Sequence, residues 1–114
     1  MDGRCRVVIT GLGVVSPLGT GIDAVWSGLM AARSTATRIT RFDTSAFAVQ
    51  ICCPVEGFDP LDFMDYRDAR RFDRLVQYAV GAARQASDQA GLDVQALDRD
   101  RVGVLMGAGM GGME

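Results

Sequence analysis

Side chains that commonly carry out enzyme chemistry are scarce in this sequence. Its 114 residues include no histidine and three cysteines, Cys5, Cys52 and Cys53. Histidine is the commonest general base and a frequent metal ligand, so the chain alone offers no Cys–His or Ser–His pair and no zinc site. Cys52 and Cys53 precede Pro54, where the sequence predicts neither a helix N-terminus nor a cation to activate a thiol. We interpret all three cysteines as reduced thiols, and Cys52 and Cys53 as small buried or half-buried hydrophobes.

Glycine-rich turns are the second feature that could serve chemistry, and one follows the apolar run 102–106. Gly107, Gly109 and Gly112 match G-x-G-x-x-G, which opens the dinucleotide fingerprint when it follows a strand. That fingerprint also needs a helix that begins at the loop and an acidic residue about twenty positions later. Neither falls within the sequence. Nucleotide binding therefore stays open as an alternative function.

The other glycine turn follows the apolar run 6–10 and contains Gly11 and Gly13. Ser16 stands where a third glycine would be, and Pro17 interrupts the helix start that a pyrophosphate would need. We interpret this segment as a tight turn between a strand and a loop.

Composition limits the classes of function. The chain is 48% hydrophobic and 23% charged, values typical of a protein that forms a core, and it is long enough for one domain. A net charge of −2 gives no electrostatic case for binding nucleic acid or an anionic membrane. No apolar run is long enough to span a bilayer, and the N-terminus resembles neither a secretory signal nor a transit peptide. We expect a cytoplasmic protein without metal or cofactor.

The periodicity of apolar residues predicts strands over 6–10 and 102–106, both buried on two faces as in a parallel sheet. A helix is predicted from Ile22 to Met30, with Thr20 or Gly21 as its cap, Asp23 in a capping box and Trp26 facing a core.

Further along the chain, residues 33–47 are predicted to form a loop and residues 48–53 an edge strand. A single long helix is expected over 68–90, with Gly91 ending it. A right-handed crossover would set the two central strands parallel. Because open α/β sheets usually have five or six strands, the chain is predicted to be part of a larger layered domain.

Taken in order, these segments resemble the N-terminal part of a β-ketoacyl-acyl-carrier-protein synthase, most closely the elongating type II condensing enzymes. The similarity is carried by residues 6–19, Trp26 and Leu29, residues 42–47, Phe58-Asp59-Pro60, residues 70–73 and residues 107–112. Two surface segments depart from the family pattern, residues 32–36 and Cys53-Pro54. The order and spacing of the motifs span the whole chain.

The resemblance implies an α/β, thiolase-like fold: two similar halves in a layered αβαβα sandwich, with residues 1–114 an incomplete first half that lacks the rest of its domain and the C-terminal half. It also implies a decarboxylating Claisen condensation between malonyl and acyl thioesters on acyl carrier protein, in a homodimer. In the family a cysteine nucleophile and two histidines follow the glycine loop. Accordingly, no residue of this chain is assigned a catalytic role, and the chain alone is predicted to be inactive and poorly folded.

One functional position carries over from the family, the variable residue of the glycine loop at the acyl pocket, which is Met110 here. A long thioether side chain can fill or vacate an apolar channel. Gly107, Gly109, Gly111 and Gly112 would let the loop move with it. The alternative is that Met110 packs against a partner subunit.

Three alternative functions remain open, of which two share this fold and one does not. A polyketide ketosynthase, or a catalytically silent partner like a chain-length factor, would share the fold, and the silent partner would lack the nucleophilic cysteine. A nucleotide-binding Rossmann module is the remote alternative.

Overall fold

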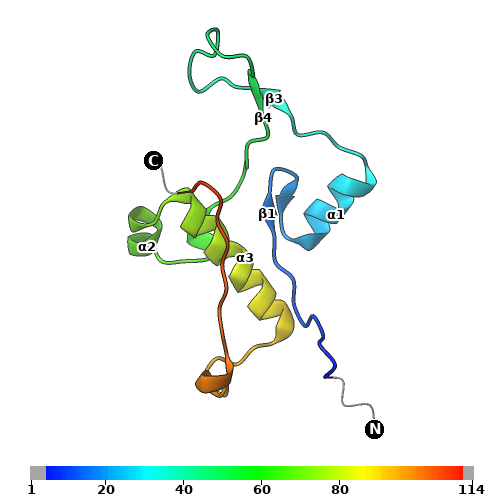
Figure 1. Ribbon diagram of the computed structural model, residues 1–114, viewed down its shortest axis with the longest axis vertical. Helices are drawn as coiled ribbons and strands as arrows, with labels where there is room; N and C mark the ends of the chain where they lie inside the picture. The colour runs from blue at the N-terminus through cyan, green and yellow to red at the C-terminus, as the bar shows by residue number, and fades with distance from the viewer. Residues whose placement is uncertain (1–4, 112–114) are drawn as a thin grey trace.

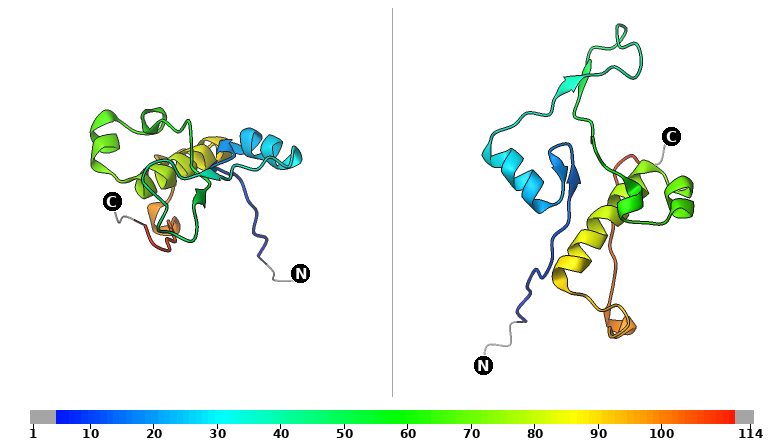
Figure 2. Two further views of the ribbon diagram at one scale, coloured as in Figure 1. Left: turned by 90° about the horizontal axis from the view of Figure 1, so that it is seen from above. Right: turned by 180° about the vertical axis from the view of Figure 1, so that it is seen from behind.

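The computed structural model describes residues 5–111 of the chain. Its principal-axis extents are 62 × 37 × 24 Å, so the molecule is elongated, and its longest helix, α3 (Arg74–Ala90), lies at the centre. The segment that leads into β1 (Val15–Ser16) runs along one side of α3, and the segment that follows residue 101 runs along the other (Figure 1). The two views in Figure 2 show the same arrangement from above and from behind.

Helix α3 has a well-defined beginning and end. At its start the Asp73 carboxylate accepts a hydrogen bond from the Val76 N–H at 2.9 Å, which satisfies one of the unpaired N–H groups of the first turn. At its end Gly91 takes the left-handed conformation, with φ 62° and ψ 35°, as a C′ glycine does. The predicted helix end is confirmed.

The single helix predicted over 68–90 is wrong in its first part, because two helices occupy this stretch. Helix α2 spans Tyr66–Arg71 and is capped by Asp65, whose carboxylate accepts from the Asp68 N–H at 2.8 Å. Phe72 and Asp73 are both extended, with ψ 142° and 170°, and this breaks the helix at the residue that caps α3. An aspartate that caps one helix therefore ends the one before it.

The predicted helix at Ile22–Met30 is present as α1, and its N-cap is Gly21 with φ 98°. No side chain caps this helix, so the predicted capping box does not form. Trp26 is 63% exposed, which contradicts the expectation that it faces a core. β1 pairs antiparallel with β2 (Gly19–Thr20) just before the helix.

A hairpin follows α1 and extends away from the other elements (Figure 1). β3 (Thr37–Arg38) pairs antiparallel with β4 (Ile51–Cys52), with Thr37 opposite Cys52. The edge strand predicted over 48–53 is confirmed in shortened form, whereas the loop predicted over 33–47 contains β3. Two short 3-10 turns complete the elements, η1 (Pro60–Asp62) and η2 (Arg99–Arg101).

The two predicted central strands do not form in the described part of the chain. Residues 6–10 and 102–106 have no strand partner, and Val7, Val104 and Leu105 are 92%, 87% and 97% exposed. The parallel pairing expected from a crossover is therefore also wrong within residues 5–111. A parallel strand needs neighbours to satisfy its backbone groups and cover its two faces, and these residues do not supply them.

A small aromatic cluster is the best-packed apolar part. Phe58 is buried, stacks on Phe63 at 5.5 Å between ring centroids and meets Tyr78 edge-on at 5.0 Å. Gly81 of α3 lies under this cluster, and a β-carbon there would be 2.9 Å from Phe58 Cε2. The cluster fixes residues 58–63 to the middle of α3.

Candidate functional site: the glycine loop and the groove beside α3

The predicted gate residue lies in a bend at the end of the described chain. Gly109 and Met110 form the bend, and the Met110 side chain is 84% exposed. β-Carbons built on Gly107 and Gly109 would meet no atom within 4 Å, so side chains could be placed at these two positions without overlap. Gly112, the last glycine of the predicted loop, lies outside the described residues.

Gly111 connects the loop to α3 through one side chain. A β-carbon built on Gly111 would overlap Cδ2 of Leu75 and lie 3.0 Å from its Cγ and 3.1 Å from its Cδ1. No positive φ accompanies this contact, so the absence of a side chain, not an unusual backbone conformation, is what the position requires. Leu75 lies in the first turn of α3, two residues after its capping aspartate.

An apolar groove of about 360 Å³ lies between α3 and the segment that leads to the loop. Its lining is formed on the helix side by small and branched residues and on the other side by the segment's own residues: Leu75, Val76, Ala79, Val80, Ala83, Val104, Met106, Gly107 and Ala108. The groove thus begins at Leu75, the residue that contacts Gly111. Its chemistry suits alkyl groups, and it offers no charged side chain for a phosphate.

The first glycine turn packs directly on the α3 backbone. A β-carbon on Gly13 would overlap the Ala82 carbonyl oxygen, and one on Gly11 would overlap that of Ala86. The space that a phosphate would need is therefore filled by the helix. The predicted interpretation of this segment as a tight structural turn is confirmed.

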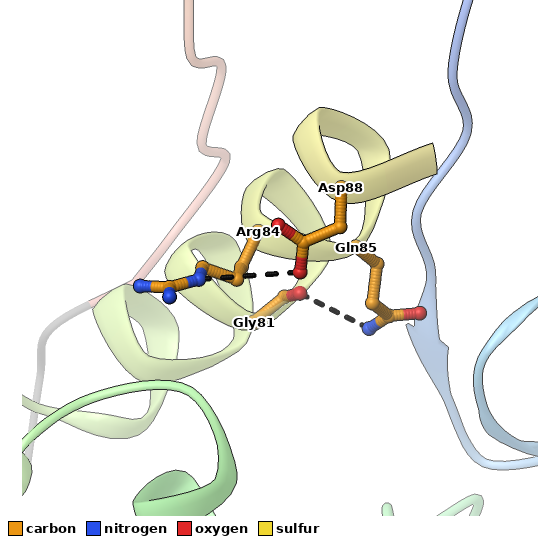
Figure 3. A network of polar contacts seen from close by, with 4 residues as sticks. All are labelled: Gly81, Arg84, Gln85 and Asp88. Carbon is orange, nitrogen blue, oxygen red and sulfur yellow. Dashed lines mark hydrogen bonds and ion pairs between the residues drawn. The ribbon is translucent and has the colours of Figure 1, made fainter. Parts of the chain in front are cut away.

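Two glutamines of α3 hold the same turn by its backbone. Gln89 Oε1 accepts from the Leu12 N–H at 2.6 Å, and Gln85 Oε1 accepts from the Val14 N–H at 3.5 Å. Gln85 also donates to the Gly81 carbonyl at 3.0 Å, and Figure 3 shows its side chain on the flank of α3 that faces β1. Sequence reasoning missed both residues, although their spacing of four places them on one helix face.

The cysteines are more accessible than predicted. Cys5, Cys52 and Cys53 are exposed and carry free thiols, so the interpretation of the pair as half-buried hydrophobes is wrong. The hairpin formed by β3 and β4 projects from the body of the molecule, which leaves both faces of β4 uncovered. Within residues 5–111 no group of three or more cysteine or acidic side chains is arranged to hold a metal ion.

No described helix combines the length and the apolar character that crossing a bilayer requires. The carboxyl group of Asp43 has a lowered pKa. The backbone N–H of Ser45 donates to its carboxylate at 2.9 Å and the Ser45 hydroxyl at 3.1 Å, and these bonds lower the pKa of Asp43 below its usual range. This effect belongs to the loop between β3 and β4.

Comparison with known proteins relates this geometry to a family. The family model for the beta-ketoacyl synthase N-terminal domain matches residues 4–114. The chain is 48% identical over 108 residues to 3-oxoacyl-[acyl-carrier-protein] synthase 2 of Coxiella burnetii, a match covering 95% of this chain and 26% of that protein. It is 40% identical over 114 residues to the synthase of the same name from Staphylococcus aureus, covering 100% of this chain and 28% of that protein.

Solved structures give the same relationship. The ishigamide ketosynthase/chain length factor matches with a TM-score of 0.69 at 45% identity, covering 83% of this chain and 24% of that one. A beta-ketoacyl synthase from Burkholderia phymatum matches with a TM-score of 0.66 at 30% identity, covering 85% and 24%.

The chain thus spans about a quarter of the length of the relatives it matches. The predicted fold class is confirmed as that of the ketosynthases, of which these residues form an N-terminal portion. Nucleotide binding by a Rossmann module loses its support, because the family match extends over both glycine turns. The chain belongs to the beta-ketoacyl synthase family, and its residues 4–114 match the model for the N-terminal domain of that family.

Proposed function

We propose that this chain is the N-terminal portion of a 3-oxoacyl-[acyl-carrier-protein] synthase, an acyltransferase of fatty-acid chain elongation. The observation that carries the proposal is that relatives of this name match 95% to 100% of the chain at 40% to 48% identity. The substrates would be malonyl-acyl-carrier protein and an acyl thioester. The remainder of the thiolase-like sandwich would be supplied by sequence other than residues 1–114.

In the proposed reaction a cysteine thiolate first attacks the acyl thioester on acyl carrier protein, forms a new thioester with the acyl group and releases the thiolate of the carrier. Loss of carbon dioxide from the malonyl group leaves an enolate, whose carbon attacks the thioester carbonyl and expels the thiolate. Histidines that assist this step would have to come from elsewhere, because residues 1–114 contain none. The partner would be acyl carrier protein, and the working form a cytoplasmic homodimer.

The part of the site that this chain would supply is the wall of the acyl pocket. Met110 is 84% exposed, and a β-carbon on Gly109, the residue before it, would meet no atom within 4 Å, so the Met110 side chain is free to change rotamer. In this proposal Met110 gates the entry of the growing acyl chain. Its thioether would fill the channel or leave it as chain length increases.

The test uses a grafted synthase, in which this chain replaces the matching segment of the Coxiella burnetii relative. We expect the grafted synthase to condense malonyl- and acyl-acyl-carrier protein. Replacing Met110 with Phe should lower kcat/KM for long acyl chains relative to short ones by about tenfold, because one side chain in an apolar pocket discriminates to this degree. A folded but inactive graft would contradict the synthase assignment. An unchanged chain-length profile in the Met110→Phe variant would remove only the gate.

A second candidate is a catalytically silent partner of the chain-length-factor type. It is favoured by the match to the ishigamide ketosynthase/chain length factor at 45% identity. Such a partner shapes a pocket in a heterodimer but does not condense substrates. The two candidates differ in whether the gene that encodes this chain also encodes a nucleophilic cysteine followed by two histidines.

The 114-residue chain by itself is expected to show no condensation and no malonyl decarboxylation. Release of labelled carbon dioxide from malonyl-acyl-carrier protein measures this directly, with the grafted synthase as the positive control. Turnover by the chain alone would overturn the expectation that its catalytic residues lie elsewhere.

A further inference from the structure

Of Gly107, Gly109 and Gly111, only Gly111 lies close to a side chain of α3. Gly107 and Gly109 have open space where a β-carbon would be, whereas a β-carbon on Gly111 would overlap Leu75 Cδ2 and lie 3.0 Å and 3.1 Å from its Cγ and Cδ1. Met110 lies between the free part of the loop and this attachment. The position of Leu75 therefore decides how far the backbone of Met110 can approach the helix.

Leu75 also lines the apolar groove and is the first residue of α3 to do so. It lines the groove together with Gly107 and Ala108, the residues that lead into the bend. The groove, at about 360 Å³, is larger than a methionine side chain and has an apolar lining. With Leu75 in place the Met110 side chain stays outside the groove and is 84% exposed. Without the Leu75 side chain, the loop would have both room and an apolar surface to fold back against α3.

We propose that Leu75 is a positioning residue for acyl chain-length selection: its contact with Gly111 holds the loop away from α3 and so sets the resting position of Met110. This inference rests on the proposed gate at Met110. Leu75 does not touch the acyl chain in this proposal. It acts through Gly111, which must lack a side chain so that the loop can seat on the leucine.

The geometry predicts opposite effects of two single substitutions on the preference for long over short acyl chains. Leu75→Ala removes the side chain that holds the loop away from α3, so Met110 can move into the groove. The kcat/KM for long acyl chains should then rise relative to that for short ones. Gly111→Ala adds a methyl group that overlaps Leu75, which pushes the loop away from α3 and Met110 further into the acyl path. The kcat/KM for long acyl chains should then fall relative to that for short ones. In the double variant the smaller side chain at 75 accommodates the new methyl group, and the profile should return toward that of the parent.

The experiment measures kcat and KM of the grafted synthase for a short and a long acyl-acyl-carrier protein in all four combinations. We expect the long-to-short ratio of kcat/KM to rise about fivefold in Leu75→Ala, to fall about fivefold in Gly111→Ala and to return to within about twofold in the double variant. Leu75→Met, which nearly conserves volume, should keep the parental ratio. Leu92→Ala is the matched control, because Leu92 is similarly exposed, at 48% against 39%, and follows the other end of α3.

A purely structural role would give a different result. Leu75→Ala and Gly111→Ala would then lower Tm and would lower kcat/KM equally for both substrates, so the long-to-short ratio would not change. The double variant would be less stable and less active than either single variant. That outcome overturns the proposal even if Met110→Phe alters the profile. If Met110→Phe has no effect while the compensation between 75 and 111 is observed, the gate at Met110 fails: Leu75 still positions the loop, but selection of chain length through Met110 is overturned. If Met110→Phe and the substitutions at 75 and 111 all leave the long-to-short ratio unchanged, the gate at Met110 and the role of Leu75 are both overturned.

Discussion

The two glycine turns have almost the same sequence setting but different environments. Each follows an apolar run, and each lies against α3 (Figure 1). In the first turn, both Gly11 and Gly13 fit against helix carbonyl groups so closely that no side chain could be placed there. In the second turn, β-carbons on Gly107 and Gly109 would meet no atom within 4 Å, and the three atoms nearest to one on Gly111 all belong to the flexible Leu75 side chain.

Hydrogen bonds increase this difference. The N–H groups of Leu12 and Val14 in the first turn donate to Gln89 and Gln85, whereas residues 107–111 have no recorded hydrogen bond to α3. Glycine in the first turn permits close backbone packing and therefore fixes the chain. Glycine in the second turn removes side chains that would restrict the backbone and therefore leaves it adjustable. One pattern thus serves a structural role in one place and a conformational role in the other.

The largest expected difference between the turns is in their tolerance of a methyl group. Gly13→Ala in the grafted synthase should destabilise it by about 3 kcal/mol, at the upper end for overpacking, because the methyl group overlaps the Ala82 carbonyl oxygen and lies 2.8 Å from the Ala86 N–H nitrogen. Gly107→Ala should change stability by less than about 0.5 kcal/mol, because its β-carbon meets nothing.

Thermal denaturation of the two variants measures this difference, with soluble yield as a second readout. The contrast between the turns would be refuted if the two substitutions lowered Tm equally. It would also be refuted if Gly13→Ala were neutral, since the helix would then have moved aside at little cost.

Local signals along the chain predicted the parts that depend on local geometry. The α3 pattern, the left-handed Gly91 and the short edge strand before Pro54 follow from periodicity and from the backbone preferences of glycine and proline. The break before α3 could also have been found, because Asp65 and Asp73 both precede helical stretches and both act as caps. Family membership followed from the order of motifs along the chain.

Features that depend on distant partners could not be predicted in this way. Residues 6–10 and 102–106 have the composition of buried strands, but a strand forms only where a neighbour pairs with it, and composition does not supply the neighbour. Trp26 and the cysteines were misplaced for the same reason, since burial depends on what covers a surface. The Leu75–Gly111 contact joins residues 36 positions apart in the sequence, and no local pattern indicates it.

A smaller effect is expected from the hydrogen bonds that secure the first turn. Gln89→Ala should destabilise the grafted synthase by about 1 kcal/mol, because it removes the acceptor of the Leu12 N–H. Arg84→Ala is a control on the same helix: its ion pair with Asp88 is 4.0 Å long, both side chains are largely exposed, and Figure 3 shows the pair on the helix surface. Such pairs contribute about 0.5 kcal/mol or less.

Amide hydrogen exchange at Leu12 distinguishes a lost hydrogen bond from a general loss of stability. Protection of this amide should fall in Gln89→Ala and persist in Arg84→Ala. If both variants lost the same protection, Gln89 would not be what distinguishes the first turn from the second.

The smallest effect concerns a segment that contacts neither turn, the loop between β3 and β4. Ser45 stabilises the ionised form of Asp43, so the native pKa of this carboxyl is lower than in the unfolded chain. The contribution is complete above the unfolded pKa of about 3.9 and is lost as pH falls through the native pKa.

Acidification below pH 4 should therefore loosen residues 43–45, whereas Asp43→Asn should show the looser loop at neutral pH. Because Asp43 is fully exposed, the change should appear in the exchange rate of the Ser45 amide and leave Tm and the glycine loop unaffected. An effect of Asp43→Asn on the chain-length ratio would show that the hairpin and the loop at Met110 are coupled, contrary to the independence expected here.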